Sequence, residues 1–194
     1  MIRAVVAAGL LVATAAHAQT PVPGADKPKK DRDRAGKSTK HGAVPVPGTK
    51  PIALINLYNG WNDEWLALRP DEKATQPTIE RFLRCHYTNE PGKMDPKLID
   101  IVVSAAQHFK SDRVTVVSGF RHPKYNLLLR KKGHQVARDS EHTHGNAIDF
   151  QVAKVTVQQL HAWAKEQAIG GVGLYLKSQF VHMDTGKIRY WSGE

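Results

Sequence analysis

Two short segments near the C-terminus alternate between apolar and polar residues, a period of two that predicts β-strands. In the first segment, Ala147 to Val152, alternate apolar residues share one face and Asp149 lies on the other. In the second, Phe180 to Asp184, the residues opposite the apolar face are His182 and Asp184. Both predicted strands therefore carry titratable groups on the face that points away from the expected core.

Helical spacing of apolar residues marks four further segments. The clearest begins at Asp95, which can cap a helix, and continues with Pro96, which fits a first turn. The predicted helices span Gln76 to His86, Asp95 to Phe109, Pro123 to Lys132 and Val157 to Gln167. Strands are predicted at Val114 to Val117 and at the last three apolar runs. Because helices come mostly first and strands mostly last, we expect an α+β domain with a small antiparallel sheet flanked by helices on one side.

The N-terminal part of the chain differs in composition from the rest. Residues 1–18 combine a positive charge at Arg3, an apolar run and the small-residue sequence Ala16-His17-Ala18, which is typical of a cleavable signal peptide. An uncleaved membrane anchor is the alternative, although a spanning helix needs about 20 apolar residues. Residues 19–50 are rich in Pro, Gly, Lys, Arg and Asp, which favours a disordered basic linker. Residues 51–194 are enough for one domain with one core.

The positive charge of the chain is concentrated in that linker. Residues 19–50 have eight Lys or Arg against three Asp, a net +5 that is half of the formal +10. Without the linker and Arg3, residues 51–194 carry only about +4. No basic stripe with interleaved aromatic residues follows, which argues against nucleic-acid binding. The basic linker is explained by solvation of a spacer, with attraction to an anionic wall or membrane surface as the alternative.

A histidine and an aspartate suggest half of a metal site. His142, in the loop before the first predicted strand, and Asp149 flank Gly145, which permits a turn that brings imidazole and carboxylate together. Alone, such a pair is more usually a hydrogen-bonded surface pair. With His182 added, two imidazoles and a carboxylate match the three ligands of catalytic zinc, which leaves a fourth position for water. A structural zinc site takes four ligands, often thiolates, and Cys85 is the only cysteine.

Four motifs follow one another along the chain: Ser118-Gly119-Phe120-Arg121, S-x-H-x-x-G-x-A-x-D from Ser140, Gly170-Gly171-Val172-Gly173 and V-H-x-D-x-G from Val181. In this order they resemble the D-Ala-D-Ala-type (LAS) zinc metallopeptidase superfamily. Within it, the chain from roughly Leu54 to Trp191 is most similar to the MepK-type murein endopeptidases. The resemblance implies a zinc cofactor bound by His142, Asp149 and His182. It also implies that Arg121 stabilises the oxyanion or holds the substrate carbonyl.

The general base departs from the pattern of the superfamily. Many of these peptidases place an Asp or Glu three residues before the last histidine ligand, but this chain has Gln179, whose amide cannot accept a proton at neutral pH. Asp184 is the nearest carboxylate on the same strand face as His182, and we expect it either to act as the base or to orient a ligand. His144 is the second candidate for the base, with a solvent-facing or substrate-contacting role as its alternative.

The resemblance implies an exported enzyme of the cell wall. We expect a zinc endopeptidase that cleaves murein peptide cross-links during wall remodelling in a Gram-negative periplasm, with peptidoglycan stem peptides and cross-links as its partners. A D,D-carboxypeptidase that trims stem peptides is one alternative, because the choice between the two depends on loop shape. A non-catalytic peptidoglycan-binding module is another, and Gln179 is consistent with it.

The remaining candidate residues have structural interpretations. Three histidines lie in predicted helices without the spacing of a ligand pair: His86, His108 and His161. Cys85 is expected to be a buried free thiol. Trp61 and Trp65 are interpreted as core or rim aromatics in preference to a platform for sugar stacking.

Overall fold

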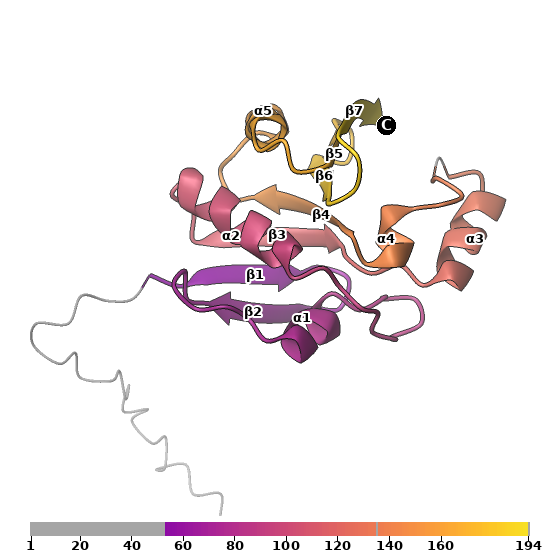
Figure 1. The fold of residues 1–194 in the computed structure, drawn as a ribbon, viewed down its shortest axis with the longest axis horizontal. Coiled ribbons are helices and arrows are strands. Elements are labelled where there is room, and N and C mark those ends of the chain that lie inside the picture. Colours follow the sequence, from indigo (N-terminus) through magenta and orange to yellow (C-terminus); the bar gives the residue numbers. More distant parts are fainter. Residues whose placement is uncertain (1–52, 135, 194) are drawn as a thin grey trace, which may run out of the picture. The chain divides into compact units, whose positions relative to one another are not determined.

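The structure is a computed structural model that describes residues 53–134 and 136–193. The expected signal peptide (1–18) and linker (19–50) lie outside these residues. Within them the elements follow in the order β1 (Ile55–Asn59), β2 (Glu64–Leu68), α1 (Gln76–Phe82), α2 (Lys97–His108), β3 (Arg113–Ser118), α3 (Pro123–Lys131), α4 (Glu141–His144), β4 (Ala147–Val152), α5 (Val157–Glu166), β5 (Gly171–Tyr175), β6 (Phe180–Asp184) and β7 (Arg189–Gly193). Figure 1 shows this arrangement.

The strands form one sheet in the order β2-β1-β3-β4-β6-β5-β7. The α+β class is confirmed, but the expectation of a small antiparallel sheet is wrong. The sheet has seven strands and is mixed, because β1 pairs with β3 and β5 pairs with β7 in parallel. Parallel neighbours require a connection that returns to the starting end of the sheet, and between β1 and β3 this connection consists of the antiparallel strand β2 followed by α1 and α2.

The first two strands were not predicted. In β1, alternate residues Ile55, Leu57 and Asn59 are buried, as a strand with one covered face requires. The pairing partner of Leu57 in β3 is Val114, far along the chain. The alternation in so short a segment identifies a strand only together with its pairs, the antiparallel one with β2 and the parallel one with β3.

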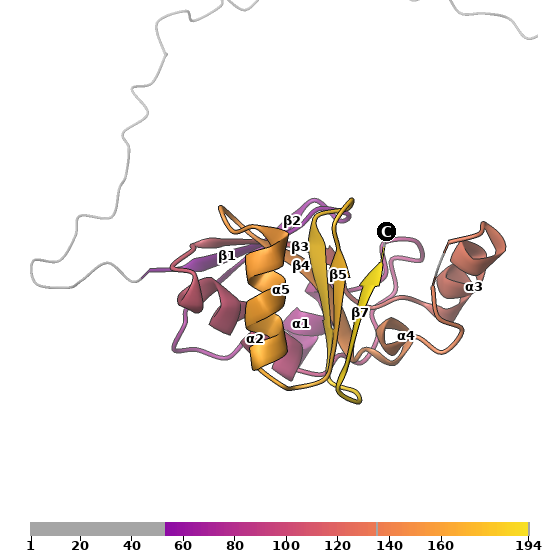
Figure 2. The same ribbon diagram turned by 90° about the horizontal axis from the view of Figure 1, so that it is seen from above.

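Helices α1, α2 and α5 cover one face of the sheet (Figure 2). Alternate strand residues such as Phe150 and Val181 join helix residues such as Leu98 and Leu160 in a single apolar core. The helix predictions hold with shifted ends: α1 stops at Phe82, and α2 is assigned from Lys97. Asp95 still stabilises the N-terminal end of α2, because its carboxylate accepts the Lys97 N–H at 3.0 Å.

We expected His142 to lie in a loop, but the structure places it in the short helix α4. Gly145 ends α4 with φ +74°, a left-handed conformation that glycine adopts without strain. A Cβ at this position would lie 1.8 Å from the carbonyl oxygen of Lys93. The tight turn predicted at Gly145 is therefore confirmed, and it requires glycine for both conformation and space.

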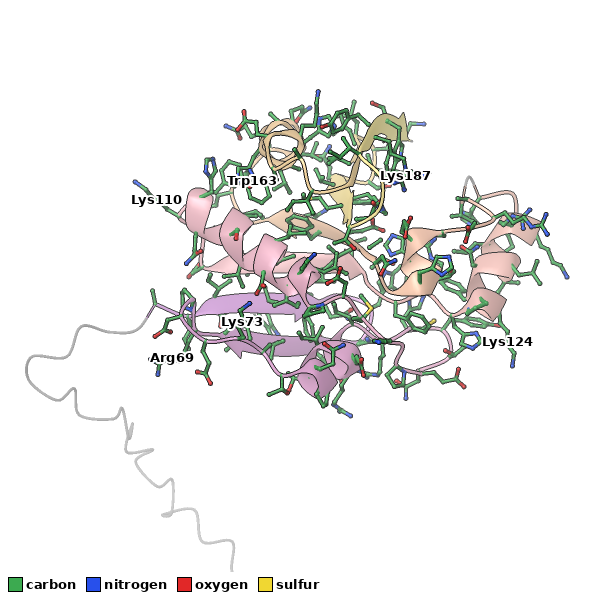
Figure 3. All side chains as sticks on the ribbon, in the orientation of Figure 1. Arg69, Lys73, Lys110, Lys124, Trp163 and Lys187 are labelled. Atoms are coloured by element: carbon green, nitrogen blue, oxygen red, sulfur yellow. The ribbon has the colours of Figure 1, made fainter. Side chains whose placement is uncertain are left out.

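The outer surface carries the charged side chains of the domain. The lysines labelled in Figure 3 (Lys73, Lys110, Lys124 and Lys187) come from different parts of the chain and lie well apart. None of the helices in the described part of the chain is long and apolar enough to cross a bilayer.

Candidate metal centre

The three predicted ligands line one cleft of about 350 Å³. Its other walls are acidic, cationic and aromatic, formed chiefly by Asp139, Glu141, Arg121, Arg189, Tyr175, Phe180 and Trp191. The cleft lies on the sheet face opposite the helices, because Asp149 and His182 alternate with core residues along β4 and β6. Polar groups thus converge on a hollow with aromatic sides, as in many binding sites.

Local pairing brings the ligands together. Strands β4 and β6 are antiparallel, and Asp149 is directly opposite His182. His142 reaches them from α4, after the turn at Gly145. All three side chains are buried, and among the described residues they form the one group of three His, Cys, Asp or Glu residues close enough to share a metal ion.

The distances between the ligand atoms fit a tetrahedral metal ion. His142 Nε2 lies 3.2 Å from Asp149 Oδ1 and 3.2 Å from His182 Nδ1, and His182 Nδ1 lies 2.9 Å from Asp149 Oδ1. Zinc binds nitrogen and oxygen at about 2.0 to 2.2 Å, which places tetrahedral ligand atoms about 3.3 Å apart. The residues therefore fit zinc in donor type, number and spacing.

A second layer of hydrogen bonds aims both imidazoles. The Nδ1–H of His142 donates to the carbonyl oxygen of Gly119 at 2.8 Å. A carbonyl can only accept, so Nδ1 carries the proton and the lone pair of Nε2 points to the centre. His182 uses its atoms the other way round: Nε2–H donates to Asp184 Oδ2 at 3.0 Å, and Nδ1 faces Asp149. Such partners fix the tautomer and ring orientation of metal ligands.

Asp184 is fully buried behind His182. Besides the His182 Nε2–H, its carboxylate accepts the backbone N–H groups of Gly171 and Gly186 at 2.8 and 2.9 Å and the guanidinium of Arg189 at 2.8 Å. Burial raises the pKa of Asp184, but the hydrogen bonds from His182, Gly171 and Gly186 outweigh burial and bring the pKa down to about 2. Of the two expected roles, this geometry favours orienting a ligand over acting as the base.

The electrostatics of the ligands favour a cation at the centre. Burial lowers the pKa of His142. Burial also opposes ionisation of Asp149, yet both imidazoles hold the pKa of its carboxyl well below the usual range. For His182, burial is outweighed by hydrogen bonds to Asp149 and Asp184, which raise its pKa to about 9. The buried Asp149 carboxylate is therefore ionised at the centre, where its negative charge would attract a divalent ion.

Arg121, for which the resemblance implies an oxyanion or carbonyl role, is a lining residue of the cleft. Its backbone N–H donates to the carbonyl of His142 at 3.0 Å, which ties the arginine to the ligand helix. The guanidinium Nη1–H donates to Asn126 Oδ1 at 3.4 Å, and Asn126 is held in turn by the carbonyl of Ala137 at 3.0 Å. Arg121 is therefore held at the cleft through its backbone and through one N–H of its guanidinium.

Neither His144, the second candidate for the base, nor Gln179, at the position where many of these peptidases have the base, lines the cleft. His144 has a side chain that is 53% exposed, and its Nε2 lies 2.6 Å from Asp139 Oδ1 at the rim of the cleft. The bond to Asp139 raises the pKa of His144. Gln179 lies in the β5–β6 turn, where its amide bonds to the carbonyl of Leu176, and it is not a lining residue of the cleft.

Sequence reasoning missed several residues of the cleft. Glu141 is a lining carboxylate next to a ligand, where its Oε2 accepts the Asn146 side-chain N–H at 3.2 Å. Arg189 holds Asp184, and Trp191 packs 5.0 Å from the His182 ring. Glu141 directly precedes His142, and this position in the sequence could have identified it as a residue of the cleft. The β7 residues had no such signal, because their approach depends on the parallel β5–β7 pair.

Comparisons with known proteins agree with the resemblance seen in the motifs. The family model described as peptidoglycan L,D-endopeptidase MepK matches residues 62–191. The chain is 29% identical over 153 residues to the probable peptidoglycan L,D-endopeptidase MepK of Haemophilus influenzae, covering 78% of this chain and 82% of that protein. It is 33% identical over 149 residues to the peptidoglycan L,D-endopeptidase MepK of Escherichia coli K12, covering 75% and 82%. No solved structure matches significantly. The family model and both relatives match most of the length of this chain. The chain therefore belongs to the MepK family of peptidoglycan L,D-endopeptidases.

Proposed function

We propose that this protein is a zinc-dependent endopeptidase that hydrolyses peptide cross-links in peptidoglycan. The observation that carries the proposal is the spacing of His142 Nε2, Asp149 Oδ1 and His182 Nδ1, which fits one tetrahedral ion, in a chain of the MepK family. His142, Asp149 and His182 would hold the zinc. When bound, zinc acts as a Lewis acid that polarises a carbonyl and makes water acidic enough to supply a nucleophile near neutral pH.

Arg121 is assigned to the carbonyl oxygen of the scissile bond. It lines the same cleft as the ligands and is held by Asn126 through one N–H of its guanidinium. The remaining N–H groups of a guanidinium can donate to an oxygen on which negative charge develops. Because that charge exists only in the transition state, Arg121 should act mainly on the rate of the chemical step.

Proton transfer is assigned to Glu141. Asp184 is saturated by donors behind His182, so we assign it to orient that ligand. His144 lies at the rim, paired with Asp139. Glu141 is a partly buried carboxylate that lines the cleft beside His142, where it can take a proton from the attacking water and pass it to the leaving amine.

The substrate and location follow from the family. Relatives of this chain are named as peptidoglycan L,D-endopeptidases, so the bond that we propose is an internal one between an L- and a D-configured residue. Peptidoglycan lies outside the inner membrane, which agrees with the signal peptide expected at residues 1–18 and with a periplasmic location.

Incubation with defined muropeptides tests the proposal. Purified protein is given dimers with an L,D cross-link, dimers with a D,D cross-link and uncross-linked stem peptides, with and without a chelator. We expect cleavage of the L,D dimer that stops with the chelator and returns on addition of zinc. Release of a terminal D-Ala from stem peptides alone would indicate a carboxypeptidase. Binding of all three without cleavage would indicate a non-catalytic module.

A further inference from the structure

Four rings from three separate segments are stacked into one row, here called the aromatic row. Trp61, in the β1–β2 turn, stacks on His86 with centroids 4.3 Å apart and 8° between the ring planes. His86 meets the edge of Tyr125 of α3 at 4.8 Å. Tyr125 stacks on Tyr87 at 5.0 Å and 12°. The row thus ends in a tryptophan on one side and a tyrosine on the other.

Both end rings of the aromatic row are open to solvent. Trp61 is 60% exposed and Tyr87 is 57% exposed, so of the core and rim positions expected for Trp61 the structure shows the rim. Aromatic rings of this size normally contribute to stability by being buried. Flat rings whose outer surface stays open instead offer a face to which a ligand can add.

The aromatic row adjoins the metal cleft. Burial lowers the pKa of His86, and the charge of Arg121, a lining residue of the cleft, lowers it further. Burial raises the pKa of Tyr125 and the charge of Arg121 opposes that rise, and the guanidinium of Arg121 bonds to Asn126, the next residue of α3. A substrate whose scissile carbonyl meets Arg121 can therefore extend directly onto the row.

We propose that the aromatic row is a carbohydrate subsite that binds an N-acetylated hexosamine of the glycan strand while the attached peptide lies in the cleft. This inference rests on the proposed function, because peptidoglycan consists of such sugars bearing short peptides. It extends that function by assigning recognition of the glycan to residues outside the metal centre.

The chemistry of the row fits a sugar better than a second peptide. The C–H bonds on one face of a pyranose carry partial positive charge, which matches the negative face of an aromatic ring. The loop that carries His86 and Tyr87 also exposes Asn89 and Glu90, polar side chains that can bond hydroxyl and acetamido groups. A peptide that is bound by pairing its backbone with a strand edge would not use these side-chain rings.

Trp65 provides a matched control. It is 59% exposed, four positions after Trp61, but it packs on Tyr58 at 4.7 Å instead of joining the row. For the whole protein, kcat/KM is measured on an L,D cross-linked peptide with its glycan attached and on the same peptide without glycan. The ratio of the two values should fall about five- to tenfold in Trp61→Ala and Tyr87→Ala. It should stay at the wild-type value in Trp65→Ala, and Trp61→Phe should restore most of it.

An unchanged ratio in both Trp61→Ala and Tyr87→Ala would overturn the proposal, because a row that holds peptide or only supports Arg121 affects both substrates equally. A second measurement does not depend on catalysis. A tetramer of N-acetylglucosamine is titrated into the protein while the indole N–H signals are followed by NMR. The signal of Trp61 should shift and that of Trp65 should not. If the Trp61 signal shifts although the protein cleaves no substrate, the proposed enzymatic function fails and the subsite stands. If the Trp61 signal does not shift, the subsite fails.

Discussion

Asp184 lies on the opposite side of the His182 ring from the metal centre: it accepts the Nε2–H at 3.0 Å, whereas Nδ1 of the same ring lies 2.9 Å from Asp149. A strand places residues i and i+2 on one face, so the sequence put Asp184 beside His182 without showing which ring nitrogen it meets. Because Asp184 meets Nε2, the nitrogen that faces away from the centre, we assign Asp184 to hold the His182 ring in position.

Asp184→Asn should therefore weaken zinc binding. The amide keeps one acceptor oxygen but sets an NH2 against donors such as Gly171 N–H and Arg189, so the orientation of His182 is lost. We expect zinc affinity to fall about 10- to 100-fold, measured by competition with a chelating dye. The exposed Asp100→Asn variant is the control. Wild-type affinity combined with lost turnover would restore Asp184 as the base.

Glu141→Gln should separate chemistry from metal binding. If Glu141 takes the proton, its amide analogue keeps zinc and fold but loses about 100- to 10,000-fold in kcat. His144→Ala, which changes only a rim pair with Asp139, should lose less than about tenfold, below the range for a general base. Steady-state kinetics on the cross-linked dimer measure both. The reverse order of the two defects would transfer the base to His144.

Arg121→Ala should lose transition-state stabilisation. Removing one oxyanion donor typically costs about 100- to 1,000-fold in kcat, and zinc content should not change. Arg121→Lys should recover little, because an ammonium does not reproduce the planar fork that meets both Asn126 and the substrate. A rise in KM at constant kcat would show that Arg121 only binds the ground state.

Two glycines allow strain to be separated from lack of space. Gly145 and Gly133 both have positive φ, +74° and +82°, but only Gly145 has backbone where a Cβ would lie. Gly133→Ala should cost about 1 to 2 kcal/mol of unfolding free energy for conformation alone. Gly145→Ala should cost about 2 to 5 kcal/mol, since overpacking adds to the same strain. Denaturant unfolding measures both, and equal losses would contradict the close packing of α4 against Lys93.

The parts of the fold that were predictable are those coded locally. The alternation in Ala147 to Val152 gave β4 with the observed bounds, and the opposite faces of Asp149 and the core residues followed from it. Likewise Pro123 and Gly133 marked the ends of α3 to within a residue or two. The motif spacing also brought the three candidate ligands together, although their identity came from the resemblance as well as from the residues.

The parts that were not predictable depend on distant pairing. β1 has only five residues, so its alternation is too short to identify a strand without the pairs that it forms with β2 and β3. Arg189 and Trp191 reach the cleft through the parallel β5–β7 pair in the same way. Cys85, by contrast, was predicted to be a buried free thiol and is one, although it lies beyond the end of α1 and not in the helix expected to contain it.

The zinc content of ligand variants tests the account most directly. Elemental analysis of the purified protein should find about one zinc per chain, and His142→Ala, Asp149→Ala and His182→Ala should each lose it, because two ligands no longer hold the ion firmly. His108→Ala and His161→Ala, which change histidines outside the cleft, should keep it. Full zinc in a folded His182→Ala protein would contradict the three-ligand centre on which the proposed activity depends.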